Sequence, residues 1–73
     1  MKNNRYQYAM VMRPPMMGAL PNKGFRCILV EHECRKYNSK LNMFIWAIVE
    51  YDRELEQHEL EAYEMVKFDG YDS

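Results

Sequence analysis

The chain has 73 residues, of which 48% are apolar and 29% are charged, with a formal net charge of −1. This length fits a single domain, residues 1–73, and a chain of this size buries only about 60% of its unfolded surface. Three Phe, six Tyr, one Trp and seven Met supply large side chains for a small core. The composition excludes a disordered chain. The size leaves little room for a catalytic cleft, which favours a surface that binds a partner.

The charges are distributed unevenly. Residues 1–40 carry eight Lys or Arg against two Glu, whereas residues 41–73 carry two against nine acids. The two halves either neutralise each other when they pack or leave one acidic and one basic face. The net charge itself gives no global electrostatic argument for nucleic-acid binding.

No targeting or membrane segment is expected. The apolar stretch 8–12 is stopped by Arg13 and two prolines, which makes it too short for a signal peptide. The apolar run 43–49 is far shorter than the roughly 20 residues of a membrane helix. We therefore expect a cytoplasmic protein with no membrane partner, in which Cys27 and Cys34 are free thiols.

The first half of the chain predicts strands and a long loop. Residues 5–12 alternate between two faces and predict a strand. Residues 13–24 contain three prolines and two glycines, which exclude a strand or helix and predict a loop. Residues 25–33 and 42–53 predict an antiparallel β-hairpin with its tip at Asn38-Ser39.

The central stretch of the chain is residues 43–53, which hold the longest apolar run and the only tryptophan, Trp46. Both faces of residues 43–49 are apolar, which predicts cover on both sides. From Glu50 onwards the pattern is amphipathic, so we expect the core to end at Val49 and the strand to emerge into solvent. If the helix and loop are too small to cover both faces, a second copy would bury the rest, which makes a homodimer the alternative to a monomer.

Residues 54–64 consist of helix formers without a β-branched residue and predict a helix of about two turns. Leu60 and Tyr63 can share a face, and Leu55 lies before the first turn as a staple. There is no Ser, Thr or Asn cap; acids near the start suit the helix dipole instead. Residues 65–68 return to strand character. The predicted fold is α+β, a small antiparallel β-sheet with one short helix in the order β-β-β-α-β.

Catalytic and metal-binding patterns are weak. The soft metal ligands are Cys27, His32, Cys34 and His58, and their spacing matches no common zinc pattern. The Cys and His residues lack a recognisable third, orienting group, and the glycines form no phosphate-binding loop. We therefore expect no enzyme, no metal site and no cofactor, and we expect Cys27 to be a small apolar core residue.

Two surfaces are candidates for binding another protein. The loop 13–24 carries apolar side chains that either fold back as a lid or form the adaptable surface that methionine suits. The segment 50–64 holds seven acids, which form either a solvated helix surface or a face for a basic, nucleic-acid-binding site on another protein. The candidate protein-binding residues are Arg13, Met16, Met17, Leu20, Glu50, Asp52, Glu54, Glu56 and Glu59.

A basic hairpin tip is the alternative binding surface. Its cations could contact phosphates while an aromatic ring stacks on a base. The cations are few and the domain is not basic, which makes nucleic acid the second choice of partner. The candidate residues are Arg26, Arg35, Lys36, Tyr37 and Lys40.

Two stretches also carry a resemblance: YAMVMRPPMMGALPNKGF, a loop after a strand, and WAIVEYDRELEQHELEAYEMV, a strand followed by a short acidic helix. Together they resemble small uncharacterised accessory proteins of phages and conjugative elements of Gram-positive bacteria. This chain differs in having Asn22 ahead of Lys23 and no Ser or Thr cap at residue 56. The resemblance implies a mobile-element accessory role and assigns no activity to any residue.

The sequence therefore predicts a non-catalytic protein-binding module. The resemblance adds that it inhibits or modulates a host defence or nucleic-acid enzyme. The alternative is a small nucleic-acid-binding protein that uses the basic hairpin tip.

Overall fold

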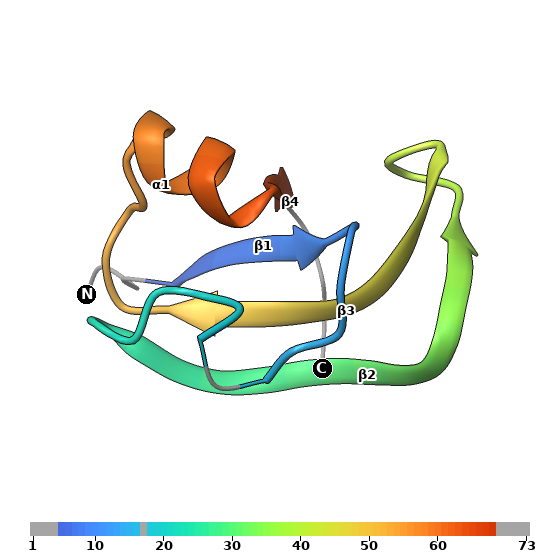
Figure 1. Ribbon diagram of the computed structural model, residues 1–73, viewed down its shortest axis with the longest axis horizontal. Helices are drawn as coiled ribbons and strands as arrows, with labels where there is room; N and C mark the ends of the chain where they lie inside the picture. The colour runs from blue at the N-terminus through green and yellow to red at the C-terminus, as the bar shows by residue number, and fades with distance from the viewer. Residues whose placement is uncertain (1–4, 17, 69–73) are drawn as a thin grey trace.

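The computed structural model of the protein describes residues 5–16 and 18–68. The elements follow one another as β1 (Tyr6–Met10), β2 (Phe25–Asn38), β3 (Met43–Tyr51), α1 (Gln57–Tyr63) and β4 (Met65–Phe68) (Figure 1). The predicted α+β class and the order β-β-β-α-β are confirmed. No helix in these described ranges is long and apolar enough to cross a membrane.

The four strands form one antiparallel sheet in the order β2-β3-β1-β4. The predicted hairpin is present as β2 and β3. The first strand of the chain inserts between β3 and β4, so that Tyr8 lies opposite Val49 on one side and Lys67 on the other. This position explains why Tyr8, Ala9 and Met10 are all buried, since a central strand is covered by neighbours on both edges.

Each face of the sheet has its own hydrophobic cluster, because successive strand residues point to opposite faces. The first cluster joins Tyr8 of β1 and Tyr51 of β3 to Leu20 of the loop and Leu55, the residue before the helix. The predicted helix face packs against it through Leu60 and Tyr63. The second cluster has as its buried members Ala9, Ile45, Ile48 and Phe68.

A large bulge in β2 bends the far end of the hairpin. Glu31 lies opposite Ala47 and Lys36 opposite Ile45, so four residues of β2 face a single residue of β3, Trp46. Bulges of this kind bend the strand that carries the extra residues, and Figure 1 shows the hairpin turning sharply near its tip. We call residues 35–45 the hairpin arm.

The arm folds back over the second face of the sheet. Leu41 packs against the second cluster, and the Lys40 ammonium lies 5.7 Å from the centre of the Phe68 ring. The turn closes with Asn42 in the left-handed region, at φ 57°, which asparagine tolerates better than most residues. The chain thus covers part of its own second face with its own hairpin.

The buried part of β3 is shifted towards the end of the strand relative to the expectation. Ile45 to Tyr51 lie in the interior apart from the half-buried Trp46, whereas Met43 and Phe44 are exposed. The prediction that the core ends at Val49 was therefore wrong. The reason is the insertion of β1, which pairs only with Ala47 to Tyr51 and leaves the start of β3 in the arm.

Other element boundaries also differ from the prediction. The strand β2 extends to Asn38 and not only to residue 33, so Cys34 lies in the strand. Both cysteines are exposed, which makes the expectation of a buried Cys27 wrong; β2 is an edge strand, and neither cluster includes Cys27. The helix begins only at Gln57.

Two glycines with positive φ provide a matched pair for testing the loop. Gly24 has φ +81°, and an added Cβ would lie 2.8 Å from Asp52 Oδ1 and 2.9 Å from Arg53 Cγ. Gly18 has φ +86° with open space around it. We expect Gly18→Ala to lower the free energy of unfolding by about 1 kcal/mol through backbone strain alone. Gly24→Ala should lower it by about 1–3 kcal/mol more, because the methyl group has no room.

Urea unfolding followed by circular dichroism measures both values. Equal losses for the two variants would show that the close approach of residues 24 and 52 does not constrain the fold.

Candidate functional site

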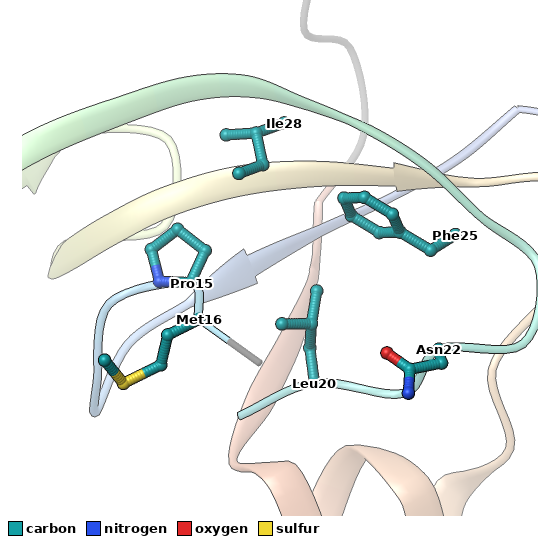
Figure 2. A pocket seen from close by; sticks show the side chains of 6 residues that line it. All are labelled: Pro15, Met16, Leu20, Asn22, Phe25 and Ile28. Atoms are coloured by element: carbon teal, nitrogen blue, oxygen red, sulfur yellow. The ribbon is translucent and has the colours of Figure 1, made fainter. Parts of the chain in front are cut away.

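An apolar hollow lies between the loop and the start of β2 (Figure 2). Its volume is about 260 Å³. Met16, Phe25 and Ile28 are among the large apolar side chains that the structure leaves exposed. We call this cavity the loop hollow, and the residues that line it are Pro15, Met16, Leu20, Asn22, Phe25 and Ile28.

The second half of the loop is fixed to the sheet. The Tyr51 hydroxyl donates a hydrogen bond to the carbonyl oxygen of Pro21, and Leu20 is buried in the first cluster. The Phe25 ring packs edge-on against Tyr51, with centroids 5.6 Å apart. Burial raises the pKa of Tyr51 far above its usual range, so this hydroxyl remains a donor across the physiological pH range. The hollow therefore has one firm wall.

The predicted loop residues divide between the two roles that the sequence left open. Leu20 folds back onto the core as a lid, whereas the Met16 side chain is 59% exposed. Arg13 forms an ion pair with Glu64, the C-cap residue that follows α1. Met17 lies outside the described residues. The sequence predicted Phe25 and Ile28 as strand residues and not as site residues. They line the hollow because the strand that carries them lies at the edge of the sheet.

Glu50 is buried and does not belong to an exposed acidic face. Only 6% of its side chain is exposed, and its carboxylate pairs with Arg5 Nε at 2.9 Å and with Arg26 Nε at 3.4 Å. It lies opposite Gln7 of β1 and Cys27 of β2. Two cations from the first half of the chain thus neutralise an acid in the middle strand.

Glu59 also forms intramolecular bonds and is not available to a partner as a free carboxylate. Its carboxylate accepts hydrogen bonds from Arg53 Nη1 at 2.9 Å and Nη2 at 2.8 Å, and from the Glu56 backbone N–H at 2.9 Å. The bond from Arg53, followed by that from the Glu56 backbone, lowers the pKa of Glu59 to about 2. Arg53 also donates from Nε to the carbonyl oxygen of Lys23 at 2.9 Å. Glu59 thus supplies the reciprocal half of a capping box, in which the third helical residue binds the backbone N–H of the N-cap residue, and through Arg53 it joins the helix to the loop.

The remaining acids form a smaller surface than the sequence predicted. We call the exposed residues Asp52, Glu54, Glu56 and Glu61 the acidic surface. Glu54 lies 3.5 Å from Lys67 Nζ, and Glu56 lies 3.4 Å from His58 Nδ1. Glu56 also lines a polar depression of about 340 Å³ that shares Asn22 with the loop hollow.

The expected basic cluster is divided. Arg26 lies at the start of β2, where it pairs with Glu50, at the opposite end of the strand from the tip. Arg35, Lys36 and Tyr37 are exposed on the hairpin arm, while Lys40 lies over the Phe68 ring. Within the described part of the chain, no group of three or more His, Cys, Asp or Glu side chains could hold a metal ion.

The depressed pKa of Glu59 predicts a pH dependence of stability. The unfolded chain takes up this proton near pH 4.5, whereas the folded protein does so only near pH 2. The stabilisation is therefore complete above pH 4.5 and is lost as the pH falls towards 2. We expect thermal unfolding curves of the wild type to lose more stability on acidification than those of Glu59→Gln.

Glu61→Gln is the matched control, because it removes a carboxylate from the same helix whose partner is the neutral Gln57. If Glu59→Gln and Glu61→Gln showed the same acid sensitivity, the Arg53–Glu59 pair would not be the cause.

Comparison with known protein families shows to which family the chain belongs. A family model described as "Defence against restriction A C-terminal" matches residues 3–70. No curated protein and no solved structure matches the chain. The family description links the chain to protection against restriction, which agrees with the predicted accessory role in phages or other mobile elements. Because the match covers nearly the whole chain, the protein belongs to the defence against restriction A C-terminal family.

Proposed function

We propose that the protein is a non-catalytic binding module that acts in defence against restriction by binding a host restriction protein at the loop hollow. The observation that carries this proposal is the cluster of exposed apolar side chains, Met16, Phe25 and Ile28, around one cavity. Exposed apolar groups that gather at a cavity are typical of protein-binding sites.

The size of the hollow supports a protein side chain as its occupant. Its volume of about 260 Å³ lies below the roughly 300–1,000 Å³ of most small-molecule pockets. It is large enough to receive one large apolar side chain of a partner. Binding energy at protein interfaces concentrates in such anchors, which insert into preformed pockets. The unbranched Met16 side chain can adjust to the shape of the anchor.

The surroundings of the hollow have the composition of an interface rim. The polar depression that adjoins it at Asn22 is lined by Lys23 and Glu56 among others. An apolar centre with a polar, charged edge is the usual arrangement of a protein–protein interface. In this proposal the acidic surface contributes through Glu56 and orients a basic group of the partner, while the hollow supplies the affinity.

Met16→Asp tests the proposal. A carboxylate at the hollow should weaken binding to the restriction protein by about thirtyfold, the effect of losing one central interface contact of about 2 kcal/mol. Protection against restriction should fall accordingly. The measurements are the ratio of phage plating on restricting and non-restricting hosts, and calorimetric titration of purified restriction subunits.

Met12→Asp is the matched control, because Met12 is 57% exposed against 59% for Met16 and does not line the hollow. Ile28→Asp places the same charge on the opposite wall and should act like Met16→Asp. Wild-type protection and binding in both hollow variants, with unchanged urea stability, would exclude this surface.

A further inference from the structure

The hairpin arm carries a pair of aromatic rings that neither core cluster includes. Tyr37 and Phe44 lie directly opposite each other in the ladder between β2 and β3. Their rings meet edge to face, with centroids 5.4 Å apart and an interplanar angle of 73°. The Tyr37 residue is 52% exposed and Phe44 54%. The Tyr37 hydroxyl donates to Asn42 Oδ1 in the turn, which holds this ring against the arm.

The arm also carries two positively charged side chains, Arg35 and Lys36, outside any ion pair of the described residues. The sequence contains no acid between Glu33 and Glu50, while Arg35, Lys36 and Lys40 lie in that interval. The cations that do pair with acids elsewhere are Arg5, Arg13, Arg26, Arg53 and Lys67. Glu31 and Glu33 are exposed on the preceding part of β2 and line the same depression as Arg35 and Lys36. The excess of positive charge is therefore confined to the arm itself, residues 35–45, where it lies beside the aromatic pair.

Exposed aromatic rings beside positive charges indicate which kind of partner the arm could bind. A symmetric contact between two arms would bring Arg35 and Lys36 towards the same residues of a second copy, since such interfaces use one patch twice. Like charges in that position oppose association. A single-stranded nucleic acid offers both complements at once, because its unpaired bases stack on aromatic rings and its phosphates pair with Lys and Arg.

We propose that the hairpin arm is a binding surface for single-stranded nucleic acid. Tyr37 and Phe44 stack on bases, and Arg35 and Lys36 contact the flanking phosphates. The arm lies at the opposite end of β2 from the loop hollow. This inference therefore stands apart from the proposed protein-binding function, and either can fail without the other.

Fluorescence anisotropy of a labelled oligothymidylate, titrated with the intact protein over a range of salt concentrations, tests the proposal. For single strands, the slope of log Kobs against log salt concentration is about −0.7 per neutralised phosphate, so two cations predict a slope of about −1.4. The combined change Arg35→Gln and Lys36→Gln should bring the slope close to zero. Lys23→Gln, an exposed cation far from the arm, is the matched control and should leave the slope unchanged.

The aromatic variants give an independent readout. Tyr37→Ala with Phe44→Ala removes two base–aromatic contacts, each of which contributes about tenfold or more to the affinity, and should leave the salt slope unchanged. Tyr37→Phe, which keeps the ring, should bind like the wild type. Should the double alanine variant unfold the arm, Tyr37→Leu with Phe44→Leu keeps apolar bulk and removes only the stacking faces.

Several results would overturn the inference. The protein would fail to bind the oligonucleotide even at the lowest salt concentration, or the arm variants would bind as tightly as the wild type. Equal affinity for duplex, unaffected by the aromatic changes, would exclude stacking on unpaired bases. A wild-type dimer that Phe44→Ala converts to a monomer in light scattering would make the arm a contact between copies. Loss of restriction-protein binding in arm variants that bind the oligonucleotide normally would make it a protein surface.

Discussion

The fold depends on two buried tyrosine hydroxyls in the middle of the sheet. Tyr8 and Tyr51 pack edge to face with ring centroids 5.9 Å apart. The Tyr8 hydroxyl accepts a hydrogen bond from the Leu55 backbone N–H at 2.8 Å, and the Tyr51 hydroxyl donates to the Pro21 carbonyl. One tyrosine therefore fixes the segment that leads into the helix and the other fixes the loop. A buried backbone group without a partner would cost about 1–3 kcal/mol, so these two bonds determine where both connections lie.

The uneven charge of the chain is resolved in part by pairing between its halves. Arg5 and Arg26 from the basic half meet Glu50, and Arg13 meets Glu64. The buried Glu50 is tolerated because two guanidinium groups compensate for its removal from water. The exposed charged side chains that remain outside these ion pairs are available to bind a partner. The four residues of the acidic surface lie before and on the helix, whereas Arg35 and Lys36 lie on the hairpin arm. Glu31 and Glu33 are exposed on β2 beside the arm, so the separation of charge on the surface is partial.

The sequence predicts the elements of this fold better than their arrangement. The hairpin, the two-turn helix and the final strand follow from local residue patterns, as does the packing of Leu60 and Tyr63 against the core. The position of β1 in the sheet does not follow from local patterns. Alternation within residues 5–12 predicts a strand but does not determine which distant strands, here β3 and β4, pair with it. This pairing decides the burial of Glu50 and the exposure of Phe44. The sequence alone named Met16, Arg35, Lys36 and Tyr37 as candidates, whereas Phe44 and the hollow could be identified only from the fold.

The bulge in β2 links these observations. If the register that sets Glu31 opposite Ala47 continued, Cys34 would lie opposite Phe44; the bulge instead brings Tyr37 to that position. The same irregularity bends the arm back so that Leu41 reaches the second cluster. A bulge also interrupts an edge strand that could otherwise pair along its length with another chain. One local insertion thus shields the edge, covers the second face and creates the exposed aromatic pair, which leaves the loop hollow at one end of β2 and the basic arm at the other.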